Sequence, residues 1–192
     1  MAFQETDSKD FLSLLKSKID SSFSLLDVGS GLGLHLNSYV CNFILALDVH
    51  RPYLENRKNK LPHIVPVHAD AMKLNQLFLP RTISTVLLSD SVEHFSKKDG
   101  LQLLKMAEEI ANERVVVFTP RGFFPQTDFD FFELQGGKYQ GHKSGWEVEE
   151  FLELGFDVTL LKGFHDTSNP SFVKFLGSGH PPVDAIFACK DV

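Results

Sequence analysis

Short apolar runs alternate with segments whose hydrophobic residues have helical spacing along most of this chain. The apolar runs predict seven strands, at residues 24–28, 43–48, 64–68, 83–89, 114–118, 156–161 and 183–189. The helical spacing predicts helices at residues 11–19, 34–40, 51–60, 97–111 and 146–154. Strands that alternate with helices form a mostly parallel sheet with helices on both faces, so the pattern predicts an α/β fold.

The chain length of 192 residues favours one domain, residues 1–192, because it suffices for one full core and hardly for two. Residues 1–22 precede the first predicted strand and supply one N-terminal helix. Two long connections, residues 119–145 and 162–182, leave the carboxyl ends of the fifth and sixth strands. Connections this long in a small domain are often functional, so we expect both to lie on the substrate side of the sheet.

Composition narrows the class of protein. The chain has 43% hydrophobic and 23% charged residues, as globular proteins do, and its net charge of −6 argues against a nucleic-acid or anionic-membrane partner. Cys41 and Cys189 have no CxxC spacing, which favours a reducing compartment and argues against a cysteine zinc site. No apolar run approaches the ~18 residues of a membrane span, and the polar N-terminus lacks a signal-peptide core. We therefore expect a cytoplasmic protein.

A glycine-rich turn follows the first predicted strand, in the segment Leu26-Asp27-Val28-Gly29-Ser30-Gly31-Leu32-Gly33. Glycines allow a tight turn and let a ligand lie against the backbone, and a helix N-terminus after them offers free N–H donors. Two carboxylates follow at the same edge of the predicted sheet, because Asp48 ends the second strand and Asp70 follows the third. A carboxylate at the position of Asp48 can accept hydrogen bonds from both hydroxyls of a ribose. The combination predicts a nucleotide-type site at the carboxyl ends of the strands.

The spacing of the glycines distinguishes between cofactors. A dinucleotide site has the pattern GxGxxG, whereas here the third glycine is Gly33 and Leu34 follows it, which argues against an NAD-dependent oxidoreductase. GxGxG with Asp27 two residues before Gly29 resembles motif I of class I S-adenosylmethionine-dependent methyltransferases instead. Asp48, the Asp70-Ala71 pair and residues 89–94 are similar to later motifs of that family, and the resemblance covers roughly residues 22–190.

The resemblance implies a Rossmann-like sheet whose last strand is antiparallel, and S-adenosylmethionine as the cofactor. It assigns cofactor binding to Asp27, Gly29, Ser30, Gly31, Gly33, Asp48, Val49, Asp70, Ala71, Asp90 and Ser91. Two roles stay open for Asp27, because its carboxylate can accept from the backbone of the glycine turn or contact the ligand.

An acceptor that attacks through a hydroxyl or ammonium group needs a general base, and histidines are the side chains that we expect to titrate near neutrality. We select His94 as the catalytic candidate because it follows the fourth strand at the cofactor edge. Packing at the entry of a helix is the alternative for His94 and for Glu93. His142 and His165 lie in the two long connections, and His142 is assigned to the substrate.

Two variants of the family are excluded by the residues after the fourth and fifth strands. Methyltransferases that act on amino groups of DNA bases have an Asn or Asp followed by Pro-Pro and an aromatic residue, which Ser89-Asp90-Ser91-Val92 lacks. A metal-dependent catechol-type site requires clustered oxygen ligands, which Thr119-Pro120-Arg121 does not provide. We therefore expect no metal.

Phenylalanine is unusually frequent in this chain, with 18 residues in all. Six of them lie within residues 118–132. Residues 123–132, here called the Phe-rich loop, are expected over the cofactor edge. Phe123 and Phe124 are assigned to an apolar part of the substrate, and Arg121 either to an anionic group of it or to a surface ion pair. The expected function is methyl transfer to a small or medium organic acceptor with an oxygen, nitrogen or carbon nucleophile. The alternative is a non-catalytic protein that binds S-adenosylmethionine and acts through the Phe-rich loop.

Overall fold

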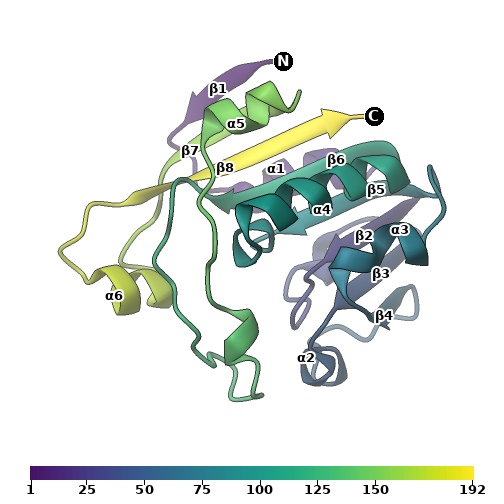
Figure 1. The fold of residues 1–192 in the computed structure, drawn as a ribbon, viewed down its shortest axis with the longest axis horizontal. Helices are drawn as coiled ribbons and strands as arrows, with labels where there is room; N and C mark the ends of the chain where they lie inside the picture. Colours follow the sequence, from purple (N-terminus) through teal and green to yellow (C-terminus); the bar gives the residue numbers. More distant parts are fainter.

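One sheet of eight strands runs through the molecule in the order β1-β7-β8-β6-β5-β2-β3-β4 (Figure 1). The computed structural model describes residues 1–192. The strands are β1 (Phe3–Thr6), β2 (Ser24–Val28), β3 (Phe43–Asp48), β4 (Ile64–His68), β5 (Ile83–Ser89), β6 (Ala111–Pro120), β7 (Asp157–His165) and β8 (Val183–Asp191). The chain order reverses between β2 and β5, so the carboxyl ends of these two strands form the crevice where open α/β sheets bind ligands.

The sheet is parallel except for β8, which lies between β6 and β7 and is antiparallel to both. The predicted Rossmann-like, mostly parallel sheet with an antiparallel last strand is therefore confirmed. The predicted number of strands was one too low, because residues 1–22 supply the edge strand β1 in addition to a helix. Its sequence, Phe3 to Thr6, is short and exposed, so it lacks the apolar signal of a buried strand.

Helices cover both faces of the sheet, as predicted. Figure 1 shows α3 (Leu74–Leu77), α4 (Lys97–Ile110) and α5 (Val148–Glu153) in front of the strands and α1 (Phe11–Ile19) behind them. Each face has its own hydrophobic cluster, with 25 buried residues on the α4 side and 15 on the α1 side. None of the helices is long and apolar enough to cross a membrane.

The segment after the glycine turn departs from the prediction. Residues 34–40 contain only the 3-10 turn η1 (Leu36–Ser38), and the helix predicted at residues 51–60 is the shorter α2 (Arg51–Glu55). The two segments bond to each other, because the Lys58 N–H donates to the carbonyl of Leu32 at 2.9 Å and the Asn59 amide donates to that of Gly33. Tertiary hydrogen bonds thus hold the backbone at the start of this segment, where the Gly33 carbonyl also accepts the 3-10 type bond from the Leu36 N–H at 3.3 Å. The expectation that a helix N-terminus offers free N–H donors here is wrong.

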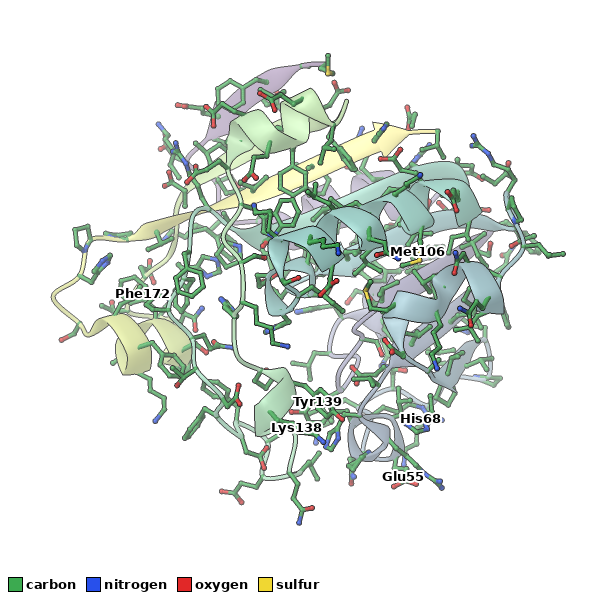
Figure 2. The ribbon with its side chains drawn as sticks, viewed as in Figure 1. Glu55, His68, Met106, Lys138, Tyr139 and Phe172 are labelled. Atoms are coloured by element: carbon green, nitrogen blue, oxygen red, sulfur yellow. The ribbon has the colours of Figure 1, made fainter.

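Both long connections contain regular structure, and the second is shorter than predicted. The first begins after Pro120, descends to the 3-10 turn η4 (Gly137–Tyr139) beside α2 and returns to α5 (Figure 1). Figure 2 shows Tyr139 and Lys138 at this lower end of the molecule, and the Tyr139 ring lies 5.3 Å from that of His50. The His50 Nε2–H also donates to the carbonyl of Leu134 at 2.7 Å, which ties the connection to β3 and α2. In the second connection, β7 continues to His165 and residues 170–176 form α6 (Pro170–Leu176).

Candidate active site

A cavity of about 650 Å³ opens at the carboxyl ends of β2, β3, β5 and β6. Its walls are the glycine turn, the turns after β3 and β5, and the connection that follows β6. The volume lies within the roughly 300–1,000 Å³ of small-molecule sites. The cavity therefore has the position and the size expected for a ligand site.

The glycine turn forms one wall of the cavity with its backbone. Gly29, Gly31 and Gly33 have φ angles of 77°, 53° and 64°, a region that side chains other than glycine rarely adopt. The N–H groups of Gly29 and Ser30 donate to the carbonyl of Leu47 at 2.9 and 3.0 Å, which fixes the turn to β3. A Cβ on Gly29 would lie 2.9 Å from the Cβ of Ser91. All three glycines are thus required by conformation, and Gly29 is required also by the close approach of Ser91.

The carboxylate of Asp48 lies at the end of β3 and links two turns. Its Oδ2 accepts from the N–H of Gly31 at 2.8 Å and its Oδ1 from that of His50 at 2.7 Å. Burial raises the pKa of Asp48, and these two backbone donors oppose the rise. Each oxygen has two lone pairs, so the carboxylate can accept further bonds from a ligand. The neighbouring Val49 lines the cavity as well.

Asp70 and Ala71 follow β4 and also line the cavity. The carboxylate of Asp70 accepts from the N–H of Met72 at 2.9 Å and thereby caps the 3-10 turn η2 (Ala71–Lys73). This bond occupies one oxygen and leaves the other to the cavity or to solvent.

Asp27 stands in the middle of the sheet, near the end of β2, and is 7% exposed. Its carboxylate makes no hydrogen bond to the glycine turn, whose N–H groups donate to Leu47 and Asp48. Of the two roles left open for Asp27, fixing the turn is therefore the wrong one in this structure. Burial, with the nearby charge of Asp48, raises the pKa of Asp27 to about 7.

The turn after β5 brings Asp90, Ser91 and Glu93 to the cavity. Asp90 has a φ of 47°, and its N–H donates to the carbonyl of Phe118 at 2.8 Å, so the neighbouring strand β6 holds it in this left-handed conformation. Glu93 is 2% exposed, and its Oε2 accepts from the Thr119 hydroxyl at 3.0 Å. Burial raises the pKa of both the Asp90 and the Glu93 carboxyl well above the ordinary range.

Four histidines line the cavity: His35, His94, His142 and His165. The rings of His94 and His142 lie edge to face with centroids 4.9 Å apart. Burial lowers the pKa of His94, and it lowers those of His142 and His165 to about 3 and about 4. The expectation that histidines titrate near neutrality here is wrong, because the same burial that raises the pKa of a carboxyl lowers that of an imidazole.

The predicted substrate residues separate into two groups. Phe124 is 4% exposed and lines the cavity beside the rings of His142 and His165. Phe123 is 60% exposed and does not line the cavity. Arg121 does not line the cavity either, because its guanidinium pairs with Glu147 at 3.1 Å and Asp184 at 3.3 Å. Of the two roles considered for Arg121, the geometry supports the ion pair and argues against a substrate contact.

Sequence reasoning missed an aromatic wall of the cavity. Phe11 of α1 stacks on Phe118 with ring centroids 4.9 Å apart and meets Phe164 edge to face at 5.5 Å. All three rings line the cavity, together with Tyr39. Only the high phenylalanine content pointed to such a wall, since the three residues lie in segments far apart along the chain.

Comparisons with known proteins address the fold. Neither a protein-family model nor a curated protein matches the sequence. A SAM-dependent methyltransferase from Archaeoglobus fulgidus superposes with a TM-score of 0.60 at 18% identity over 95% of this chain and 92% of that one. An S-adenosylmethionine-dependent methyltransferase from Mesorhizobium loti superposes with a TM-score of 0.62 at 14% identity over 94% of this chain and 96% of that one. The chain has the fold of the S-adenosylmethionine-dependent methyltransferases.

The methyltransferase fold also occurs in an enzyme named for another reaction. The [4+2]-cyclase SpnF superposes with a TM-score of 0.65 at 14% identity over 95% of this chain and 80% of that one. The function therefore has to be argued from the side chains of the cavity.

Proposed function

We propose that the protein binds S-adenosylmethionine in the cavity and transfers its methyl group to a small or medium organic acceptor. The glycine turn together with Asp48 carries the proposal. The turn leaves the backbone of Gly31 open to a ligand, because a Cβ there would meet no protein atom within 4 Å. Asp48 stands beside that backbone with acceptor capacity for the hydroxyls of a ribose.

The remaining predicted residues fit the same cofactor. In this proposal Asp70 and Ala71 contact the adenine, and Asp27, Asp90 and Ser91 contact the methionine end of the cofactor; all five residues line the cavity. The hydroxyls of Ser30 and Ser91 are buried without a partner, so both can bond to a ligand. Asp27 and Asp90 give this end an acidic character, which suits a cofactor with a sulfonium and an ammonium group.

S-adenosylmethionine supplies, when bound, a methyl group on a positively charged sulfur. The protein's part is to align the acceptor with that methyl and to exclude water. Phe124 and the aromatic wall of Phe11, Phe118 and Phe164 form apolar surface for this purpose, so the proposed acceptor has an apolar part. Phe123 and Arg121 have no place in the proposal, since neither lines the cavity.

His94 is the proposed catalytic residue. Its Nδ1 lies 3.3 Å from the carbonyl of Gly141, which can only accept, so Nδ1 carries the hydrogen and Nε2 the lone pair. Because burial keeps the ring neutral at neutral pH, this lone pair is available to a group of the acceptor. His142, beside it, is the proposed second contact to the acceptor.

A non-catalytic protein that binds S-adenosylmethionine is the second candidate. Two phenylalanines of the Phe-rich loop, Phe129 and Phe132, are partly exposed and offer a surface to a partner. The [4+2]-cyclase named above supports this candidate in one respect, because it shows that the fold is not tied to one reaction.

Calorimetry with S-adenosylmethionine and with its demethylated product, S-adenosylhomocysteine, tests both candidates. We expect both compounds to bind the wild type. If neither binds the folded protein, both candidates are wrong. A screen for methyl transfer to a panel of hydroxyl, thiol, amine and aromatic-carbon acceptors then separates them, because binding without any transfer favours the second.

A further inference from the structure

Three potential metal ligands meet on one wall of the cavity. Glu93 and His94 belong to the 3-10 turn η3 (Val92–His94) after β5, and His142 comes from the connection after β6. One ligand atom from each lies within 4.8 Å of the other two. Two imidazole nitrogens and one carboxylate oxygen are a common donor set for zinc and for other transition metals.

Two atoms of this cluster are buried without a hydrogen-bond partner: Glu93 Oε1 and His142 Nδ1. A buried polar atom that forms no bond costs about 1–3 kcal/mol, so folded proteins contain few of them. Here two such atoms belong to Glu93 and His142, which line the same cavity and have ligand atoms within 4.8 Å of each other. A ligand that accepts electron pairs would satisfy both.

His94 and Glu93 also form hydrogen bonds to groups outside the cluster, as metal-binding residues do. The Nδ1–H of His94 donates to the carbonyl of Gly141, which directs the Nε2 lone pair away from the backbone. Glu93 Oε2 accepts from the Thr119 hydroxyl at 3.0 Å. Metal-binding histidines and carboxylates characteristically have such outer partners, which fix the orientation of the ligand.

The two segments that supply the ligands are joined by backbone hydrogen bonds. The N–H groups of Lys143 and Ser144 donate to the carbonyl of Glu93 at 2.8 and 3.2 Å. His142 is thereby fixed against the turn that carries Glu93 and His94. The cluster is therefore built before any ion binds, which lowers the entropic cost of binding.

We propose that Glu93, His94 and His142 bind one divalent transition-metal ion of the zinc class in this cavity. The nitrogen donors favour such an ion over magnesium or calcium, which prefer oxygen ligands. Three protein ligands leave at least one coordination position open to the cavity, as in catalytic zinc sites. The sequence predicts His94 and His142 at the site but no metal, because it does not show that the connection after β6 brings His142 close to Glu93 and His94.

The role of the ion rests on the proposed function. A hydroxyl or thiol acceptor that coordinates the open position loses its proton to solvent more readily. The resulting anion forms a bond to the methyl carbon, while the electron pair of the methyl–sulfur bond stays on sulfur. With the ion bound, His94 and His142 act as its ligands, and they act on the acceptor through the ion instead of contacting it directly.

Metal titration of the intact chain tests the site. Chelator-treated, dialysed protein is titrated with Zn²⁺ by calorimetry and with Co²⁺ by visible absorption. We expect the wild type to bind one ion per chain. In His142→Ala and Glu93→Gln the affinity for the ion should be at least about 100-fold weaker than in the wild type. Thr119→Val, which removes only the outer partner of Glu93, is expected to weaken binding by about 10- to 100-fold. His180→Ala, at an exposed histidine outside the cavity, serves as the matched control and binds as the wild type does.

The proposal is wrong if the wild type binds no zinc, or if the cluster variants and His180→Ala bind it equally. Should a variant fail to fold by circular dichroism, the cobalt spectrum of the wild type decides. An intense four- or five-coordinate spectrum supports the site, and the weak spectrum of hydrated cobalt overturns it. S-adenosylhomocysteine binding to the metal-free protein is measured in parallel. If S-adenosylhomocysteine binds and zinc does not, only the proposed metal site is wrong. If zinc binds and S-adenosylhomocysteine does not, only the proposed function is wrong.

Discussion

Replacement of Asp27 by asparagine tests the electrostatics of the cavity. Asp27 is 7% exposed on a central strand, has no hydrogen-bond partner in the glycine turn, and has a pKa raised to about 7 by burial and by Asp48. In the unfolded chain an aspartate has a pKa of about 3.9. Asparagine has nearly the same shape and cannot ionise, so Asp27→Asn removes the titration and little else.

The sign of the effect follows from proton binding. Between about pH 4 and pH 7 the folded protein keeps the proton of Asp27 while the unfolded chain releases it, so the free energy of unfolding falls as the pH rises. The penalty is absent below about pH 4 and complete above about pH 7. A pKa difference of about 3, at 1.36 kcal/mol for each pH unit, limits it to about 4 kcal/mol. Water that enters the cavity reduces the value, so we expect about 2–4 kcal/mol.

Urea unfolding followed by circular dichroism, at several pH values between 4 and 8, measures this difference. We expect Asp27→Asn to match the wild type at pH 4 and to exceed its free energy of unfolding by about 2–4 kcal/mol at pH 8. Subtraction of the wild type cancels the other titrating groups. Glu153→Gln, at an exposed residue of α5 without an ion pair, is the control and should show no pH-dependent difference. A difference for Asp27→Asn that stays constant from pH 4 to pH 8 would refute the reasoning.

Five further substitutions test the glycine turn, Asp48 and the Phe-rich loop. Gly29→Ala combines a positive φ with a 2.9 Å approach to Ser91, so it should lower the free energy of unfolding by more than about 2 kcal/mol. Gly31→Ala has free space around its Cβ and should lower this free energy by about 1–2 kcal/mol. Equal losses in the two variants would contradict the steric argument. Asp48→Asn should weaken S-adenosylhomocysteine binding in calorimetry by about 1–3 kcal/mol, and unchanged affinity would remove Asp48 from the site. Phe124→Ala should lower the free energy of unfolding in urea by about 3–5 kcal/mol, because this ring is buried. Phe123→Ala, at an exposed ring, should change it by no more than about 0.5 kcal/mol. Similar losses in the two variants would mean that both rings are equally buried.

The sheet could be predicted because its central strands are apolar and alternate with helices. The edge strand Phe3–Thr6 could not, since it is exposed and gains its hydrogen bonds from β7, far away in sequence. The helix expected at residues 34–40 failed for a similar reason. The carbonyls of Leu32 and Gly33, just before it, accept bonds from Lys58 and Asn59, and contacts between segments so far apart in the chain do not show in a sequence pattern.

The candidate site could be predicted where its residues end strands. The glycine turn, Asp48 and Asp70 reach one cavity because the carboxyl ends of parallel strands share an edge, although their binding of a cofactor stays a prediction. The ionisation of the side chains could not be predicted, because it depends on burial. Phe124 and His142 reach the cavity only through the path of an irregular connection.

The unfavourable polar groups of this protein gather at the cavity. Nine buried side-chain atoms lack a hydrogen-bond partner, and six of them belong to residues that line it: Ser30, Tyr53, Ser91, Glu93, His142 and His165. The buried carboxyl of Asp27 and the left-handed backbone of Asp90 lie there as well. A packed core would be more stable with apolar residues at these positions, so folding stability alone does not account for them. Ligands that supply donors, positive charge or a metal ion would offset the cost of these groups, which is the pattern expected of a cavity whose residues serve binding.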